Sequence, residues 1–173
     1  RDRYRSLIVD FSVIIRAYNA EKYLKDAVNS VLNQRCGCRI EVLILYDEGS
    51  TDKTWIMIEN IIKNTNIPHN IDLKVKRHPH MSPFRALQLG LKEAKGNYVT
   101  ILDYDDIYPP SYLGTIYDVV NKHKDITFFF SRLLLVDKDG NIVSELKIPE
   151  NPYDINRIIM AGFVGASAIT LNK

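Results

Sequence analysis

Three short, largely apolar runs, each followed directly by polar residues, constrain the fold of this 173-residue chain more than any other feature. The runs are Phe11–Ile15, Glu41–Tyr46 and Tyr98–Leu102. Their length and their content of β-branched residues are typical of strands that are buried on both faces of a sheet. Segments with a helical spacing of apolar residues separate them. Strands that alternate with helices in this way predict βαβ units, and therefore an α/β fold with a mainly parallel sheet flanked by helices.

The first two helices are predicted from spacing and from capping residues. Apolar residues recur at helical spacing over residues 20–33, where Asn19 is suited to cap the helix. The second helix has Ser50 and Thr51 as its predicted capping residues. Asp52 is predicted in its first turn, where the helix dipole favours a negative charge.

Two further helices and a weaker strand complete the repeating pattern. Ser82 and Pro83 predict the start of a third helix, because proline is well tolerated at the first helical position. Gly96 is predicted to cap its end, and Pro110 to open a fourth helix. The more polar run Leu73–Lys76 predicts a strand nearer the edge of the sheet.

A β-hairpin is predicted after the last of these helices. Thr127–Val136 is a long run of residues that favour strands. The segment Asp137–Asn141 supplies turn residues, and Ile142 and Val143 begin the return strand.

The composition is that of an ordinary folded domain, with 46% hydrophobic and 25% charged residues. The net charge of +2 is too small to indicate a nucleic-acid partner, and none is predicted. No run reaches the roughly 18 apolar residues of a membrane span. Residues 1–10 are predicted to be an N-terminal extension with a solvated, locally basic start, and residues 11–173 a single domain.

The two cysteines, Cys36 and Cys38, flank Gly37. One intervening residue is an unfavourable spacing for a disulfide, and two thiols alone are a weak metal site. We therefore predict reduced cysteines in a loop, a state that is consistent with the cytosol.

Polar segments follow the three principal strands, namely Arg16–Asn19, Asp47–Asp52 and Asp103–Asp106. Ligands of open α/β sheets bind beyond the carboxyl ends of the strands, so these segments are predicted to open onto one crevice. In the last segment three carboxylates lie within four residues, where like charges repel one another and lose hydration near the core. A hard divalent cation would relieve this repulsion. We expect a metal ion and a phosphate-bearing ligand to meet there.

Four segments come in the order and spacing of a known protein family. They are Phe11–Asn19 (FSVIIRAYN), Glu41–Thr54 (EVLILYDEGSTDKT), Ala86–Gly96 (ALQLGLKEAKG) and Tyr98–Pro110 (YVTILDYDDIYPP). Over roughly residues 11–135 the chain resembles the family 2 glycosyltransferases. The resemblance implies the Rossmann-like GT-A fold, and within it the half that binds the nucleotide sugar, with a truncated acceptor side.

The resemblance assigns the nucleotide to the first two strand ends. Ala17 and Tyr18 correspond to the turn that lines the base, although Tyr18 would fit a core position equally well. Asp47 corresponds to the aspartate that binds the nucleotide, commonly at the uracil ring. A carboxylate there can accept hydrogen bonds from a base imide or a ribose hydroxyl. Glu48 replaces the more common second aspartate and is predicted in a supporting role.

The resemblance also assigns the metal. Asp106 corresponds to the aspartate that coordinates Mn²⁺ or Mg²⁺, and Asp105 to the residue that contacts the ribose or assists the metal. Asp103 is expected to support them by shaping the loop. A further contact is expected between the protein and the diphosphate of the nucleotide sugar. Arg85 is a candidate for this contact, because it lies in the first turn of a predicted helix.

Two departures from the family pattern concern the segment before the acidic motif. Leu87 and Gln88 replace the arginine and asparagine of the usual alanine-arginine-asparagine-x-glycine pattern.

The pair His78 and His80 is interpreted as two solvated loop histidines rather than a metal site, because Pro79 separates them.

No catalytic base is identified in this sequence. Family members invert the anomeric centre, and a carboxylate beyond the metal motif deprotonates the acceptor hydroxyl. The segment Ala161–Ala168 resembles the start of the acceptor side, and the base is expected beyond Lys173. Neither Glu150 nor Asp154 is assigned to this role.

These features predict an inverting glycosyltransferase that uses a metal-bound nucleotide-diphosphate sugar, a UDP-sugar, to glycosylate a glycan, lipid or protein acceptor. The expected location is the cytoplasm or the inner face of the membrane, with peripheral membrane association left open. The alternative is a non-catalytic nucleotide-sugar-binding domain of a larger assembly. A nucleotidyltransferase fits less well, because Arg16–Asn19 stands where such enzymes carry a glycine-rich phosphate loop.

Overall fold

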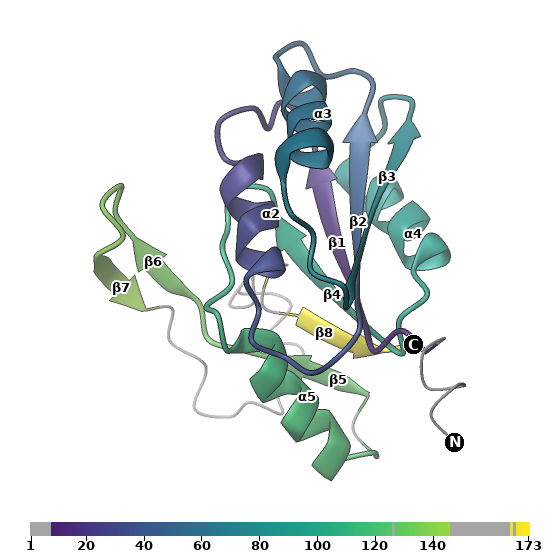
Figure 1. The fold of residues 1–173 in the computed structure, drawn as a ribbon, viewed down its shortest axis with the longest axis vertical. Coiled ribbons are helices and arrows are strands. Elements are labelled where there is room, and N and C mark those ends of the chain that lie inside the picture. Colours follow the sequence, from purple (N-terminus) through teal and green to yellow (C-terminus); the bar gives the residue numbers. More distant parts are fainter. Residues whose placement is uncertain (1–7, 126, 146–166, 168) are drawn as a thin grey trace.

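The computed structural model describes residues 8–125, 127–145, 167 and 169–173, which form an α/β fold around a six-stranded sheet (Figure 1). Its elements in chain order are β1 (Phe11–Ala17), α2 (Leu24–Leu32), β2 (Ile40–Asp47), α3 (Thr54–Asn64), β3 (Ile71–His78), α4 (Pro83–Glu93), β4 (Tyr98–Asp103), α5 (Tyr112–Lys122), β5 (Phe128–Phe130), β6 (Leu134–Val136), β7 (Ile142–Glu145) and β8 (Ile169–Asn172).

The sheet has the strand order β3-β2-β1-β4-β8-β5. β1 pairs in parallel with β2 and β4, and β2 with β3, whereas β8 runs antiparallel to β4 and β5. The predicted mainly parallel sheet is confirmed, and the more polar strand β3 lies at its edge. In register, Ala17 lies opposite Tyr46 and Arg16 opposite Asp103. The polar residues that end β1, β2 and β4 therefore lie side by side, at the carboxyl ends of these parallel strands.

Helices cover both faces of the sheet, and the strand sequences explain how. Successive side chains of a strand point to opposite faces. In β1, Val13 and Ile15 therefore pack in one core cluster with buried residues of α2, α3 and α5, whereas Ile14 packs on the other face beside α4. Gly90 allows α4 to approach closely, because a Cβ there would lie only 2.9 Å from side-chain atoms of Ile14 and Leu45.

The buried carboxylate of Glu41 ties β2 to its neighbours. It accepts hydrogen bonds from the Ser12 hydroxyl at 2.5 Å, the Lys95 backbone N–H at 2.9 Å and the Lys74 ammonium at 2.9 Å. Burial by itself raises the pKa of the Glu41 carboxyl, but these three donors outweigh it and the pKa is lowered. The turn after α4 is thus held against the first residues of β1 and β2.

The predicted start of α4 is confirmed, whereas the predicted N-caps of α2 and α3 are wrong. Ser82 is the N-cap of α4, and its hydroxyl accepts the backbone N–H of Arg85 at 3.5 Å. Asn19 does not cap α2, and neither Ser50 nor Thr51 caps α3, because both helices begin several residues later without a side-chain cap. These residues instead form hydrogen bonds with one another across two loops, as described below.

Two further local predictions are corrected. Asp52 lies just before α3 rather than in its first turn, and its carboxylate accepts the backbone N–H groups of Thr54 at 2.9 Å and Glu21 at 3.0 Å. Gly96 does not cap α4, which ends with Ala94 as its C-cap. The backbone of Gly96 instead lies very close to that of Ser12, and a Cβ on Gly96 would clash with the backbone nitrogen of Ser12.

The predicted β-hairpin is present as β6 and β7, which pair antiparallel (Figure 1). Asp137 closes its turn by accepting the backbone N–H groups of Asp139 and Asn141, each at 2.9 Å. The long strand predicted over residues 127–136 is divided, however. Its first part, β5, leaves the hairpin and pairs with β8 in the main sheet, a partner that local sequence does not reveal.

The prediction of reduced cysteines is wrong, because the structure joins Cys36 and Cys38 in a disulfide. The chain bends at Gly37 and Cys38, which leaves the two Cα atoms 5.1 Å apart, within the range that a disulfide requires. The inference of a cytosolic location from these cysteines therefore loses its basis. None of the helices in the described part of the chain has the length and hydropathy to span a bilayer.

Candidate functional site

A cavity of about 350 Å³ lies at the carboxyl ends of β1 and β2, bounded by the segment that leads into α4 and by Tyr104. Such a cavity, largely apolar with a few polar groups, is typical of a small-molecule site at the carboxyl edge of an α/β sheet. Its lining residues are Arg16, Ala17, Tyr18, Leu45, Asp47, His78, His80, Met81, Ser82, Pro83, Ala86 and Tyr104.

Asp47 is the carboxylate of this cavity, and it is positioned by its strand and by the turn that follows. It is the last residue of β2, and its side chain is only 6% exposed. Its Oδ1 atom accepts the backbone N–H of Gly49 at 2.8 Å. The structure thus brings the predicted nucleotide-binding residues Ala17, Tyr18 and Asp47 to one cavity.

The two histidines have different environments, and the interpretation of both as solvated is wrong for His78. His78 is buried, and its Nδ1 atom lies 2.8 Å from the carbonyl oxygen of Pro79. The side chain of His80 is 62% exposed, yet its Nδ1 atom lies 3.2 Å and 3.1 Å from the two carboxylate oxygens of Asp47. The ring of His80 packs against that of Tyr18, with 5.1 Å between centroids.

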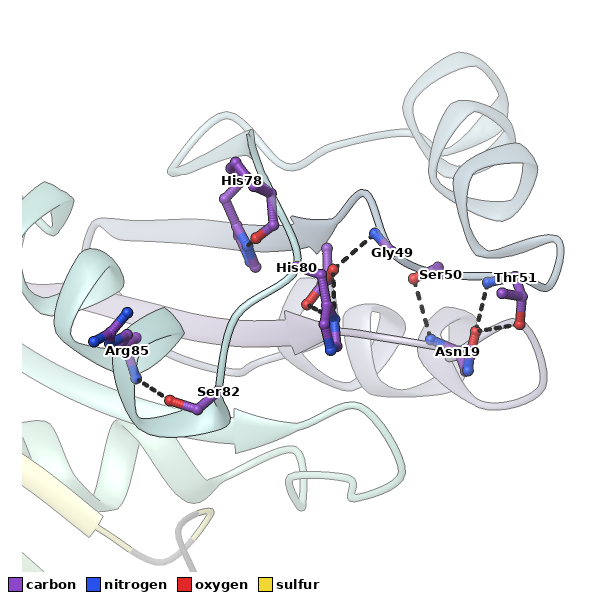
Figure 2. Close-up of polar contacts among 10 residues, drawn as sticks. Asn19, Gly49, Ser50, Thr51, His78, His80, Ser82 and Arg85 are labelled. Atoms are coloured by element: carbon purple, nitrogen blue, oxygen red, sulfur yellow. Dashed lines mark hydrogen bonds and ion pairs between the residues drawn. The ribbon is translucent and has the colours of Figure 1, made fainter.

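Asn19 joins the loops that follow β1 and β2, as Figure 2 shows. Its backbone N–H donates to the Ser50 hydroxyl at 3.2 Å, and its side-chain oxygen accepts the Thr51 backbone N–H at 2.8 Å. Asn19 has a φ of 49°, a left-handed conformation that asparagine tolerates better than most residues. This cross-link fixes the loop that carries Tyr18, which is 43% exposed and therefore not a core residue.

Arg16 connects the cavity to the acidic segment. It lines the cavity, and its Nη2 atom forms an ion pair with Oδ1 of Asp103 on the neighbouring strand. Its Nε atom is buried and has no hydrogen-bond partner within the described residues. Among the described residues that line the cavity, Arg16 alone carries a guanidinium or ammonium group.

The remaining acidic residues lie beside this ion pair. Oδ2 of Asp106 accepts a hydrogen bond of 2.5 Å from the Ser167 hydroxyl, which also accepts the Asp103 backbone N–H at 2.8 Å. Partial desolvation raises the pKa of the Asp106 carboxyl, and the charges of Asp105 and Asp103 add to this effect against the opposing hydrogen bond from Ser167. Among the described residues, Arg16 is the one cation that pairs with the acidic segment, so the segment holds negative charge in excess of it.

The loop after the acidic segment is anchored in the core by Tyr108. Its hydroxyl donates to the carbonyl oxygen of Ile101 at 2.6 Å and lies 2.8 Å from the Thr100 hydroxyl. Burial raises the pKa of the Tyr108 phenol well above its ordinary value, so the group stays protonated and remains a donor. The ring stacks on Tyr112, with 4.2 Å between centroids.

The donor set of this segment suits a divalent cation that shares its coordination with a ligand. Within the residues that the structure describes, no group of three or more histidine, cysteine or acidic side chains converges as a complete metal site. Mg²⁺-type sites commonly use one or two carboxylates and complete the shell with water and substrate phosphates. Because Asp103 is paired with Arg16, the two carboxylates left for such a site are Asp105 and Asp106.

Five predicted site residues are not among those that line the cavity. Three are the carboxylates Asp103, Asp105 and Asp106, of which Asp103 pairs with Arg16 of the cavity wall, and the others are Arg85 and Glu48. Arg85 is exposed on the first turn of α4, with its side chain directed away from His80 (Figure 2). Glu48 is turned toward β3, where its carboxylate pairs with the Arg77 guanidinium at 2.8 Å. The candidate acceptor segment 161–168, apart from Ser167, and the residues Glu150 and Asp154 lie outside the described residues.

Sequence reasoning missed three residues of the site: Arg16, His80 and Ser167. A signal was available for Arg16, because a charged residue at the end of a buried strand must find a partner. His80 and Ser167 reach the site through long-range contacts, to Asp47 and to Asp106, that no local pattern encodes.

Comparison with known proteins identifies the family and the fold of the chain. The family model for Glycosyl transferase family 2 matches residues 12–160. The minor teichoic acid biosynthesis protein GgaB of Bacillus subtilis (strain 168) is 34% identical over 121 residues, which are 70% of this chain and 13% of GgaB. TarS 1–349 of S. aureus, solved in complex with UDP, superposes with a TM-score of 0.67 at 24% identity, over 95% of this chain and 47% of that one.

A second solved structure shares the fold at lower identity. The mannosyltransferase PcManGT of Pyrobaculum calidifontis, in complex with GDP-Man and Mn²⁺, superposes with a TM-score of 0.62 at 18% identity, over 95% of this chain and 45% of that one. The chain spans less than half the length of each of these three proteins. The likeness to the two structures confirms the GT-A fold. Because the family model covers most of the sequence, the chain belongs to glycosyl transferase family 2.

Proposed function

We propose that this chain is the donor-binding part of an inverting glycosyltransferase that transfers a sugar from a metal-bound UDP-sugar to a glycan, lipid or protein acceptor. The observation that carries the proposal is one cavity lined both by Asp47 and by Arg16, whose guanidinium pairs with Asp103 of the acidic segment. A nucleoside diphosphate is complementary to these two groups. Its base carries an N–H that can donate to the carboxylate, and its phosphates carry negative charge that can pair with the guanidinium.

In this proposal the nucleoside lies against Asp47. The carboxylate accepts a hydrogen bond from a base N–H, a charge-assisted contact that is stronger than a neutral one. Ala17 and Tyr18 line the same cavity. The TarS structures in complex with UDP and UDP-GlcNAc support uridine as the base.

The diphosphate lies toward Arg16 and the acidic segment. Asp105 and Asp106 would hold Mn²⁺ or Mg²⁺, and PcManGT, with the same fold, was solved with Mn²⁺. When bound, the cation neutralises negative charge on the leaving nucleoside diphosphate, as a Lewis acid does. Arg16 supplies a second positive charge from the protein itself, and Ser167 orients the Asp106 carboxylate through its hydrogen bond.

Calorimetric titration with UDP, GDP and dTDP, each with and without Mn²⁺, tests the proposal. We expect UDP to bind most tightly, and only with Mn²⁺ at full affinity. An Asp106→Ala variant is expected to lose about tenfold in UDP affinity with Mn²⁺, or ~1.4 kcal/mol, and to bind UDP alone like the unmodified protein. An Asp125→Ala variant removes an exposed carboxylate elsewhere and serves as the control.

Two results would refute parts of the proposal. If no nucleotide binds, the assignment of the cavity as a donor nucleotide site is wrong. If Asp106→Ala leaves the gain in affinity from Mn²⁺ unchanged, the metal assignment is wrong. Release of UDP from UDP-sugars, measured with each acceptor class added in turn, then distinguishes a transferase from a non-catalytic nucleotide-sugar-binding domain.

A further inference from the structure

The carboxylate that the proposed function assigns to the base already has a partner from the protein. Nδ1 of His80 lies 3.2 Å and 3.1 Å from the two carboxylate oxygens of Asp47. Oδ1 of Asp47 also accepts the Gly49 N–H, whereas the imidazole is the one partner recorded for Oδ2 within the described residues. A base N–H that bonds to Oδ2 would compete directly with His80.

The ring of His80 is also held from its other side. Its centroid lies 5.1 Å from that of Tyr18, and the two planes are inclined by 39°. A flat base between two rings needs two contact gaps of about 3.5 Å each, so these rings are too close to enclose one. A Cβ on Gly49 would lie 2.7 Å from the Cβ of His80, so glycine at this position leaves room for the histidine.

We propose that His80 is a displaceable cap on Asp47, which a nucleotide base must remove before it can bind. The inference rests on the proposed function, because it takes Asp47 as the contact of the base. Displacement is easy, since the side chain of His80 is 62% exposed and leaves little buried surface behind. A cap of this kind lowers the apparent affinity by the fraction of molecules in which the site is open.

The cap also makes base binding sensitive to pH. Two groups face the His80 ring: the Asp47 carboxylate at the end of β2, and the Tyr18 ring after β1. A protonated imidazole pairs with a carboxylate more strongly than a neutral one does. Base affinity should therefore be lower at pH 5.5 than at pH 8, because acid favours the protonated imidazole.

The test is titration of the protein with uridine and with UDP plus Mn²⁺, at pH 5.5 and pH 8. We expect His80→Ala to bind uridine about three- to tenfold more tightly than the unmodified protein at pH 5.5, and to gain less at pH 8. Uridine carries no phosphate whose own titration would contribute. His80→Gln retains a neutral donor, so its uridine affinity should not vary with pH. His69→Ala, at an exposed loop histidine, is the control.

The outcomes separate this inference from the proposed function. Equal uridine affinity in His80→Ala and the unmodified protein would overturn the cap. A lower affinity in His80→Ala would also overturn it, and would make His80 a contact of the nucleotide. A gain for UDP without a gain for uridine would contradict the placement of the cap at the base. If no variant binds any nucleotide, the proposed function fails, and the cap fails with it.

Discussion

Arg16 shows how one side chain can serve both the fold and the candidate site. It lies near the end of a central strand, pairs with Asp103 and still lines the cavity. Its buried Nε atom has no partner within the described residues, which leaves part of its donor capacity unused. The family's usual arginine is replaced by Leu87 on the partly buried side of α4. Within the described part of the chain, Arg16 is the one cavity-lining residue with a guanidinium or ammonium group, and the proposed function places the phosphates beside it.

Replacing this arginine should affect phosphates more than the base. We expect Arg16→Gln to weaken UDP binding about tenfold, or ~1.4 kcal/mol, while uridine affinity changes less than about twofold. Calorimetry with the two ligands measures the difference. Arg85→Gln, an exposed arginine on α4, should leave both affinities unchanged. Equal losses for uridine and UDP would show that Arg16 merely shapes the cavity.

Residues of the site differ in how far the sequence reveals them. Asp47 could be predicted, because an acidic residue directly after a buried strand must lie at the carboxyl edge of the sheet. His80 could not, because its contact with Asp47 depends on the path of the segment between β3 and α4. Asn19 was predicted to be a cap from its type alone. Its hydrogen bonds to a second loop are a tertiary property.

At the scale of the elements, the network around Glu41 links three strands and one turn. Glu41 lies on β2, and its donors are Ser12 on β1, Lys74 on β3 and Lys95 in the turn after α4. A buried carboxylate without donors would cost several kcal/mol, so the three donors explain why the charge is tolerated. Since α4 also supplies part of the cavity wall, the network helps to hold that wall on the sheet.

Glu41→Gln should lower the free energy of unfolding in a pH-dependent way. The pKa of Glu41 in the folded protein lies below its ordinary value of 4.5, so the ionised carboxylate stabilises the fold above about pH 4.5. This stabilisation is lost as the pH falls through the lowered pKa. We expect a loss of about 2 kcal/mol at pH 7 that shrinks below pH 4.5, measured by urea unfolding.

A matched surface variant provides the control for this prediction. Glu93 pairs with Lys76 at 3.1 Å, but both side chains are at least 40% exposed. Exposed ion pairs contribute little, so Glu93→Gln should change the free energy of unfolding by less than about 0.5 kcal/mol at either pH. If both variants lose the same amount, or if the loss in Glu41→Gln does not vary with pH, the ionised network is not what stabilises the turn.

Elements were predictable where a regular pattern decides them. Within the described residues, three apolar runs and the more polar run Leu73–Lys76 identify the four parallel strands, and the helical periods identify the four helices. The helix starts were less predictable, since Ser50 and Thr51 bond to Asn19 instead of to their own helix. The division of the run Thr127–Val136 follows from pairing with β8, which lies about forty residues further along the chain.

At the scale of the molecule, the sheet has polar groups at both ends, and two cavities follow from this. The cavity of about 350 Å³ lies at the carboxyl ends of β1 and β2. A larger and more polar one of about 700 Å³ lies toward the start of β1 and β4, with Asp10, Arg39, Lys124 and Lys173 among its lining residues. Volume alone would favour the second, but the topology of the sheet and the family favour the first.

Ligand-dependent stability distinguishes the two cavities in the intact chain. A ligand that binds only the folded state stabilises it by RT ln(1 + [L]/Kd), about 2.7 kcal/mol at a hundredfold excess over Kd. For a chain of this size we expect UDP with Mn²⁺ to raise the Tm by roughly 5–10 °C. Asp47→Asn should lose most of this shift, because it weakens the acceptor at the carboxyl edge. Lys124→Gln, in the wall of the larger cavity, should keep it. The reverse pattern would move the nucleotide to the opposite end of the sheet.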